Sequence, residues 1–162
     1  MEKPEGRLFR EYRLKFYLNG NHYMIIGDRR GETHPHTWEF TINILVGRES
    51  FVQFNYFEQR VEKLLAPYQN HVLNGIDPFN GIVPSLENMV EYFGNNIREI
   101  VKEVGGRLLS IEGSETPTRS YIINMNRTFD DYEMKAYTEQ VRDEVIDTVL
   151  DDMLDATEEE GS

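Results

Sequence analysis

The clearest structural signal in the sequence is an amphipathic helix between Ser85 and Gly105. Apolar residues recur there every three or four positions and form one stripe of a helix: Leu86, Met89, Val90, Phe93, Ile97, Ile100, Val101 and Val104. Ser85 is a suitable N-cap, and Gly105-Gly106 is a suitable stop. A stripe of this length has to be buried against a second layer of secondary structure, which restricts the fold of the whole chain.

Segments with the character of β-strands flank this helix on both sides. Residues 8–18 are rich in aromatic and branched side chains, and residues 36–46 alternate in polarity. Residues 107–125 predict two more strands around a Glu-Thr-Pro-Thr turn, and residues 51–68 begin extended and become helical before Pro67. The order β-β-α-α-β-β predicts an α+β fold in which a four-stranded antiparallel sheet carries two helices on one face.

The end of the chain differs in composition from the rest. Residues 143–162 contain nine acidic residues and no basic one, the remainder contains 20 acidic and 17 basic residues, and the net charge is −12. From Met134 onward, apolar residues recur at helical spacing opposite an acidic face. We therefore expect a domain over residues 1–126 and an acidic C-terminal helix with a disordered end over residues 127–162. This helix packs on its own domain or subunit partner, or it docks on a different protein.

The composition disfavours several classes of partner. The near balance of charge outside the acidic end gives no strongly basic surface for the phosphates of a nucleic acid. No apolar run reaches the roughly 20 residues of a membrane span, and the first residues lack the apolar core of an export signal. The chain contains no cysteine, which excludes disulfides and thiolate ligands. We expect a cytoplasmic protein that binds neither nucleic acid nor membrane.

Two of the four histidines, His34 and His36, stand at the start of the second predicted strand. Side chains at positions i and i+2 of a strand share a face, so this pair can hold one ion together. The preceding segment, which contains Gly27 and Gly31, is predicted to be a wide hairpin loop that brings His22 to the same end. Three imidazoles suit a zinc ion with an open fourth position, although other divalent metals also accept nitrogen ligands.

Six short segments follow one another in an order that resembles a known family. They are FYLNGNHYM, HPHTW, FVQFNYF, NHVLN, PSLEN and ETPT, and they span about residues 8–125. Together they resemble the 6-pyruvoyltetrahydropterin synthase and 6-carboxytetrahydropterin synthase family. The resemblance implies the tunnelling fold, in which ββααββ subunits join their sheets around a central barrel as trimers that often stack into hexamers. It also implies active sites between subunits of a homo-oligomer.

The resemblance implies roles for each histidine and for one glutamate. It implies zinc ligation by three residues: His22, His34 and His36. It also implies that His71 relays protons and that Glu115 accepts hydrogen bonds from the 2-amino and N3 edge of a pterin ring. In this family zinc acts as a Lewis acid on oxygens of the substrate's side chain. The implied activity is a zinc-dependent lyase reaction on the side chain of dihydroneopterin triphosphate or a related pterin.

The sequence departs from the family pattern at polar positions around this site. The family uses a cysteine before its pair of zinc histidines, and this chain has none. The aspartate that usually precedes the catalytic histidine is Asn70, which has no charge to stabilise a protonated His71. The glycine between the zinc histidines is Pro35. These differences put the usual synthase mechanism in question.

Glu32 lies in the loop where the family cysteine is expected. Some family members carry a glutamate in place of that cysteine and cleave the side chain to give 6-hydroxymethyl-dihydropterin. We therefore predict that Glu32 is a second catalytic residue, a base whose pKa burial would raise. The alternative is an exposed loop glutamate beside Arg29 and Arg30, and those arginines could instead meet the phosphates of a substrate.

Two functions remain open from the sequence. The first is a zinc-dependent pterin enzyme, either a divergent synthase or a glutamate-based cleaving form; retention of all four histidines and Glu115 favours it. The second is a catalytically silent member that keeps the metal and uses its oligomer and acidic end to bind another protein. The missing cysteine and aspartate favour this second function. We expect the enzyme.

Overall fold

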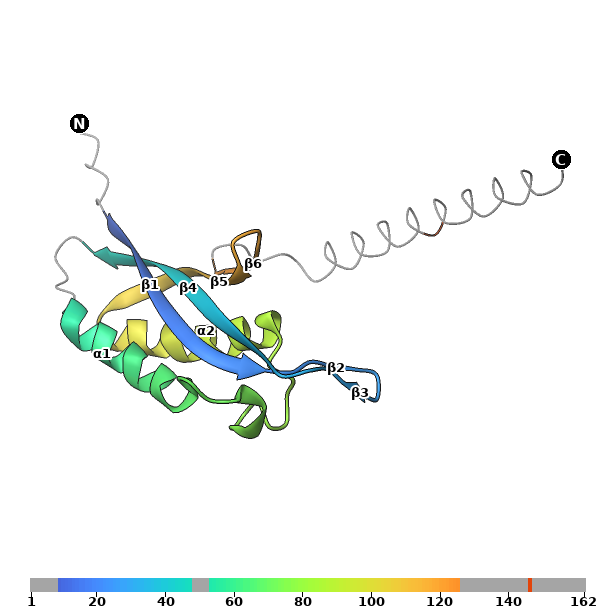
Figure 1. The fold of residues 1–162 in the computed structure, drawn as a ribbon. Coiled ribbons are helices and arrows are strands. Elements are labelled where there is room, and N and C mark those ends of the chain that lie inside the picture. Colours follow the sequence, from blue (N-terminus) through green and yellow to red (C-terminus); the bar gives the residue numbers. More distant parts are fainter. Residues whose placement is uncertain (1–8, 48–52, 126–145, 147–162) are drawn as a thin grey trace, which may run out of the picture. The chain divides into compact units, whose positions relative to one another are not determined.

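A four-stranded antiparallel sheet forms the frame of the domain (Figure 1). The structure is a computed structural model that describes residues 9–47 and 53–125 together with Ile146. The strands lie in the order β1-β4-β5-β6, and each pairs antiparallel with its neighbour. Their bounds are Phe9–His22 for β1, His34–Gly47 for β4, Gly106–Thr116 for β5 and Arg119–Asn124 for β6.

Two helices cover one face of this sheet (Figure 1). They are α1, Phe54–Leu65, and α2, Leu86–Glu103. Two short 3-10 helices follow α1, namely η1, Ala66–Tyr68, and η2, Leu73–Gly75. The predicted α+β fold, with four antiparallel strands and two helices on one face, is therefore confirmed.

Both helices end where the local sequence predicts. The Ser85 hydroxyl accepts a hydrogen bond from the Asn88 backbone N–H at 3.2 Å, so Ser85 is the N-cap of α2. Gly105 follows the helix with a φ of +78°, a conformation that glycine adopts at no steric cost. Helix α1 ends at Leu65, two residues before Pro67, because proline has no N–H to continue a helix.

The buried core lies between the sheet and the two helices. The β1–β4 register pairs Leu18 with Trp38, and directly opposed residues of an antiparallel pair share a face of the sheet. Leu18, Trp38 and Phe40 are fully buried. The opposite face carries polar side chains such as Lys15 and Glu39, which form an ion pair at 3.0 Å. The sheet therefore has one apolar face under the helices and one polar face.

The segment between β1 and β4 differs from the predicted loop. Strand β1 continues to His22, because the ladder with β4 runs on to the His22–His34 pair and so provides hydrogen-bond partners for the backbone. Beyond it, β2, Ile25–Ile26, and β3, Arg29–Arg30, form a small hairpin. Gly27 has a φ of +65° in its turn. Two-residue strands carry too little alternation to be recognised in a sequence.

Two predicted features fall on residues that the structure does not describe. The extended start of the segment before α1 includes residues 51 and 52, and the acidic C-terminal helix falls on residues 127–162, of which only Ile146 is described. The division of the chain at residue 126 stays a prediction. Within the described ranges, no helix is long and apolar enough to cross a membrane.

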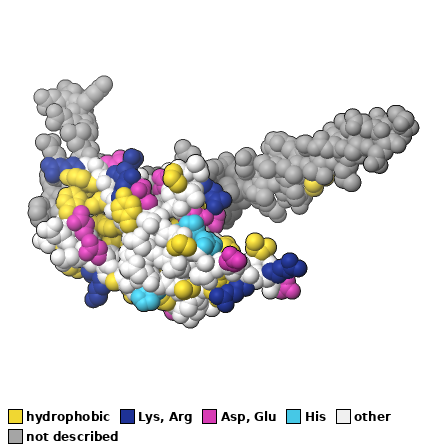
Figure 2. All heavy atoms as spheres, in the orientation of Figure 1, with side chains coloured by type: hydrophobic (Ala, Val, Ile, Leu, Met, Phe, Trp, Pro, Cys, Tyr) yellow, Lys and Arg dark blue, Asp and Glu magenta, His cyan; other side chains and the backbone are white. Residues whose placement is uncertain are grey.

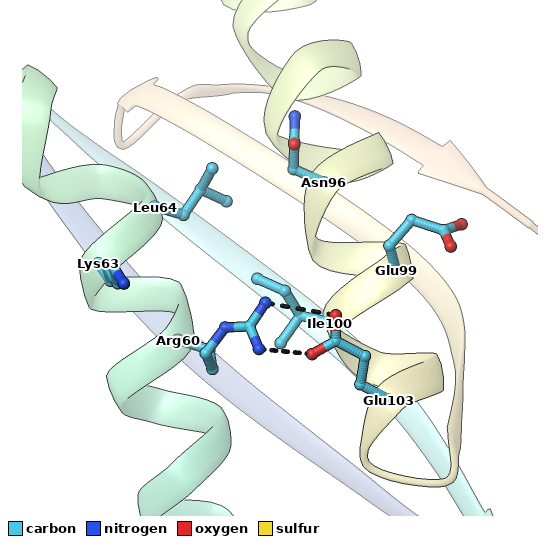
Figure 3. A pocket seen from close by; sticks show the side chains of 7 residues that line it. All are labelled: Arg60, Lys63, Leu64, Asn96, Glu99, Ile100 and Glu103. Carbon is cyan, nitrogen blue, oxygen red and sulfur yellow. Dashed lines mark hydrogen bonds and ion pairs between the residues drawn. The ribbon is translucent and has the colours of Figure 1, made fainter.

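An ion pair links the two helices at the surface (Figure 3). Arg60 on α1 donates to both carboxylate oxygens of Glu103 on α2, at 2.6 and 3.3 Å. A pocket of about 400 Å³ lies beside this pair and is also lined by Leu64 and Ile100. Because both charged side chains are partly exposed, solvent screens the pair and it contributes little to stability.

Helix α2 and strand β5 approach each other closely at two glycines. A Cβ atom on Gly113 would clash with Val90 Cγ2 and lie 3.3 Å from Leu86 Cδ1. A Cβ atom on Gly94 would lie 3.1 Å from Ile111 Cγ2. Valine is stiff at χ1 and cannot easily turn away. The two glycines therefore set the distance between the helix and the sheet.

We predict that Gly113→Ala lowers the free energy of unfolding by roughly 1–3 kcal/mol, because the added methyl group overpacks the helix–sheet contact. Gly75→Ala is the matched control, since a methyl group on Gly75 would meet no atom within 4 Å outside its own chain neighbours, and we expect it to change stability by less than about 0.5 kcal/mol. Urea unfolding of both variants measures the effect. Equal stability of the two variants would contradict the close approach.

Candidate functional site

Three histidines meet at the end of the β1–β4 ladder. His22 pairs with His34, and Gly20 pairs with His36, so all three rings project from the same face as the core. Their potential ligand atoms lie within 4.8 Å of one another. The ring centroids are separated by 4.6 Å for His22 and His34, 5.0 Å for His22 and His36, and 4.8 Å for His34 and His36. The structure thus brings together the three residues predicted as metal ligands.

Backbone carbonyl groups fix the tautomers of two of these rings. His22 Nδ1 lies 2.7 Å from the Pro84 carbonyl oxygen, and His34 Nδ1 lies 2.9 Å from the Glu32 carbonyl oxygen. A carbonyl oxygen can only accept, so each Nδ1 carries the proton and each neutral ring presents a lone pair at Nε2. Hydrogen bonds of this kind orient the histidine ligands of metal ions.

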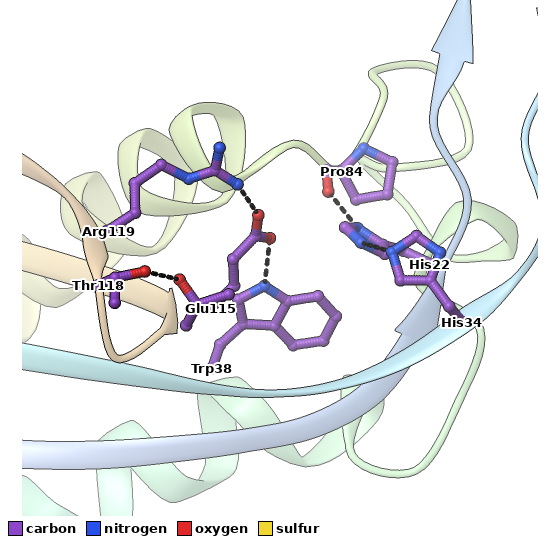
Figure 4. Close-up of polar contacts among 8 residues, drawn as sticks. His22, His34, Trp38, Pro84, Glu115, Thr118 and Arg119 are labelled. Carbon is purple, nitrogen blue, oxygen red and sulfur yellow. Dashed lines mark hydrogen bonds and ion pairs between the residues drawn. The ribbon is translucent and has the colours of Figure 1, made fainter.

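The two Nε2 atoms face each other at 3.0 Å (Figure 4). Two lone pairs at this distance repel unless a proton or a cation lies between them. Zinc binds imidazole nitrogens at about 2.0–2.1 Å, which is compatible with two nitrogens at this separation. The nitrogen donor set therefore fits a divalent transition metal.

The surroundings of His22 favour its neutral form. Its side chain is buried, with 2% of its surface exposed. Burial lowers the pKa of His22 below its ordinary value, and this outweighs the opposite effects of the Pro84 carbonyl and the Glu115 carboxylate. Only the neutral ring can donate a lone pair to a metal. His22 is thus held in the form that a metal requires.

Trp38 connects the three histidines to Glu115. Its ring centroid lies 5.0 Å from that of His22 and 5.3 Å from that of His36. Its Nε1–H donates to Glu115 Oε2 at 3.4 Å (Figure 4). Arg119, on β6, donates from Nη2 to Glu115 Oε1 at 2.8 Å. The predicted ring-binding glutamate therefore lies one side chain away from the histidines, with both carboxylate oxygens engaged.

The sequence contained signals for both partners of Glu115 that our predictions did not use. Trp38 stands two residues after His36 and so shares its face of the strand. Arg119 follows Glu115 by four residues across a tight turn, where a β-hairpin brings side chains together. Trp38 belongs to the HPHTW segment that resembles the family, but its contact with Glu115, like that of Arg119, becomes recognisable only once the strand register is known.

His71 stands apart from the three histidines in this chain. The ring is exposed, and its Nδ1 lies 2.6 Å from the Gln69 carbonyl oxygen. The His71 carbonyl accepts from the Asn21 backbone N–H at 2.9 Å, which places this loop along the edge of β1. A pocket of about 440 Å³ is lined by Asn70 and His36. Among the described residues, no hydrogen bond or ring contact joins His71 to the three histidines.

Glu32 lies two residues before His34, the first residue of β4, and only its backbone contacts the three histidines. Its carbonyl group accepts from His34, whereas its side chain is exposed. Of the nearby arginines, Arg30 stacks over the Tyr23 ring at 3.8 Å. Figure 2 shows acidic, basic and histidine side chains interspersed on one face of the molecule. The structure leaves the Glu32 carboxylate free to approach a bound molecule.

Comparisons with known proteins agree with this architecture. A family model described as 6-pyruvoyl tetrahydropterin synthase matches residues 11–126. None of the curated proteins compared with the chain matches it. The structure of Caenorhabditis elegans 6-pyruvoyl tetrahydropterin synthase aligns with a TM-score of 0.62 at 10% identity, over 73% of this chain and 96% of that chain.

Two Plasmodium structures are similar as well. The Plasmodium falciparum 6-pyruvoyl tetrahydropterin synthase aligns with a TM-score of 0.53 at 15% identity, over 71% of this chain and 96% of that chain. A catalytic-residue mutant of the Plasmodium vivax enzyme aligns with a TM-score of 0.54 at 13% identity, over 73% of this chain and 99% of that chain. At such low identity these structures support the fold, which is the tunnelling fold, while the family model covers most of the sequence. The chain therefore belongs to the 6-pyruvoyl tetrahydropterin synthase family.

Proposed function

We propose that the protein is a zinc-dependent enzyme that processes the side chain of dihydroneopterin triphosphate or a related pterin. The observation that carries this proposal is the pair of Nε2 lone pairs facing each other at 3.0 Å, with Glu115 held nearby through Trp38. A metal site beside a nearly buried carboxylate provides two different contacts for one small molecule. Family membership makes a pterin the natural candidate for that molecule.

Three histidines would hold the metal in this proposal: His22, His34 and His36. Three nitrogen ligands leave a fourth position open, as in catalytic zinc sites. A metal there would supply Lewis acidity to an oxygen of the substrate's side chain. The Pro84 and Glu32 carbonyls keep the Nδ1 protons of His22 and His34 in place, so both rings stay oriented while the substrate binds and leaves.

Glu115 would bind the ring of the pterin. Its side chain is 13% exposed, so one edge is accessible while the remainder is shielded from water. The 2-amino group and N3–H of a pterin form two adjacent donors, and a carboxylate accepts from two adjacent donors in a directional arrangement. The carboxylate would thus place the ring so that its side chain extends toward the histidines.

Glu32 and His71 would move protons in the reaction. The solved Plasmodium vivax structures include variants in which a glutamate, described as a catalytic residue, is replaced by alanine or cysteine. This supports a glutamate as the base in the present chain, which has no cysteine. No hydrogen bond or ring contact joins His71 to the three histidines among the described residues, so we propose that it acts on the site of a neighbouring copy in a homo-oligomer, a trimer or a hexamer.

A catalytically silent member of the family is the second candidate function. It is favoured by the absence of cysteine and by Asn70, which places an uncharged side chain before His71. In that case the metal would be structural, and the oligomer together with the acidic segment at residues 127–162 would bind another protein. A metal-loaded chain without turnover of any pterin would favour this second function over the first.

We predict that the purified protein contains about one equivalent of zinc per chain and that His34→Ala removes most of it, because a ligand is lost. His71→Ala is the matched control, since it removes a histidine outside the cluster, and it should keep its zinc. Metal analysis by plasma mass spectrometry measures both variants. Full retention of zinc by His34→Ala, or equal loss from both variants, would overturn the assignment of the site.

We predict that Glu32→Gln lowers turnover of dihydroneopterin triphosphate by about 10²–10⁴-fold, the usual contribution of a general base, without loss of zinc. Asp28→Asn, which removes an exposed carboxylate in the β2–β3 turn, should leave the rate unchanged. Chromatography of the products measures both variants, and 6-hydroxymethyl-dihydropterin as product would identify the glutamate-based cleaving form. A Glu32→Gln variant with the wild-type rate would exclude Glu32 as the base.

We predict that the zinc-free protein loses stability as the pH falls from 7 to about 5. Unfolded His22 takes up a proton near pH 6.5, whereas its folded pKa is lowered by burial, so acid favours the unfolded state. The slope from this one group cannot exceed about 1.4 kcal/mol per pH unit. Urea midpoints at each pH should therefore vary less in His22→Gln than in the wild type. Identical pH profiles would contradict the buried neutral state of His22.

A further inference from the structure

Arg119 is the one charged partner of Glu115 among the described residues. Its position affects which ligand rings can bind to Glu115. Its Nη2 donates to Oε1 at 2.8 Å, while Trp38 donates to Oε2 at 3.4 Å (Figure 4). The two partners differ in solvent exposure. The Trp38 side chain is fully buried, whereas the Arg119 side chain is 70% exposed.

The exposed partner is the one that an incoming ring can move. An ion pair with one highly exposed member adds little stability, so a ligand can take the place of Arg119 on Glu115 at little cost. Trp38 is packed against His22 and His36 and stays where it is. A ring that donates to Glu115 therefore rearranges the guanidinium and leaves the indole in place.

When a ligand ring donates to Glu115 in place of Arg119, the guanidinium of Arg119 is left with free N–H groups beside the edge of that ring. Arginine offers five donors and no acceptor, so its neighbour on the ligand has to be an acceptor. In a 2-amino-4-oxo pyrimidine ring, the N3–H donor has the C4 carbonyl as its other neighbour. The donor pair of such a ring matches Glu115, and the adjacent carbonyl oxygen matches Arg119.

We infer that Arg119 is a specificity-determining residue that donates a hydrogen bond to the 4-oxo group of the ring bound by Glu115. This inference rests on the proposed function, because it names the part of the pterin that the proposed site selects. Glu115 accepts from two consecutive donors on the edge of the ring, and Arg119 donates to the acceptor that follows them. Rings that lack an acceptor in the third position are disfavoured.

The test compares two ligands that differ at one atom, on the zinc-loaded full-length protein. The first is 6-hydroxymethylpterin, and the second is its 4-thioxo analogue, which keeps the 2-amino group and N3–H but has a poorer acceptor at position 4. Calorimetric titration gives the ratio of the two dissociation constants. We expect the wild type to bind the oxo ligand about tenfold more tightly, which corresponds to one charge-assisted hydrogen bond.

Three variants separate the contribution of Arg119 from other effects. In Arg119→Gln the preference should fall to twofold or less, and in Arg98→Gln, which removes an exposed charge on α2, it should stay as in the wild type. Glu115→Gln should weaken both ligands together. The urea midpoint of Arg119→Gln should match the wild type, since an exposed pair adds little stability.

The outcomes distinguish this inference from the proposed function. If the wild type binds the pterin and Arg119→Gln keeps the full tenfold preference, the inference is wrong while the ring-binding role of Glu115 stands. If Arg119→Gln unfolds at a lower urea concentration and loses both ligands equally, Arg119 is structural and the inference is also wrong. If the wild type binds neither ligand, the proposed function fails together with the inference.

Discussion

The antiparallel ladder between β1 and β4 is the constraint on which the site depends. Its register runs without interruption from Phe9–Gly47 to His22–His34, and it sets both the core pair Leu18–Trp38 and the histidine pair on one face of the sheet. A shift by one residue would turn these side chains to the polar face. The apolar core therefore fixes the register, and the register fixes the separation of the histidine nitrogens that are candidates for metal binding. The stability of the fold and the geometry of the candidate site therefore share one structural cause.

The same ladder also determines which of the candidate site residues lie together within one chain. It holds the histidines, Trp38 and, through the β4–β5 pairing, Glu115 in one group. His71 belongs to a loop along the outer edge of β1, and among the described residues no hydrogen bond or ring contact joins it to the three histidines. An edge loop is well placed to reach a neighbouring copy, because it is not covered by another strand of its own sheet. The proposed reaction would use this placement, with His71 acting on the site of a second subunit.

Much of the fold could be predicted because its signals are local. The stripe on α2, the Ser85 cap and the alternation in β4 depend on neighbouring residues, and so does the spacing of His34 and His36. The contacts that connect the three histidines to Glu115 were not predictable in this way. Trp38 and Glu115 are 77 positions apart, and only the strand pairing brings them together. The β2–β3 hairpin was missed for a different reason, since two-residue strands carry almost no pattern.

The central claim is that a metal ion binds between the Nε2 atoms of His22 and His34 and accepts both of their lone pairs. Crystals of the zinc-loaded protein, measured with X-rays on both sides of the zinc absorption edge, test this claim most directly. We expect one anomalous peak per chain, in contact with His22, His34 and His36 and with a fourth position open to a ligand. A peak elsewhere, or ordered histidines with a proton rather than a metal between their Nε2 atoms at saturating zinc, would contradict it.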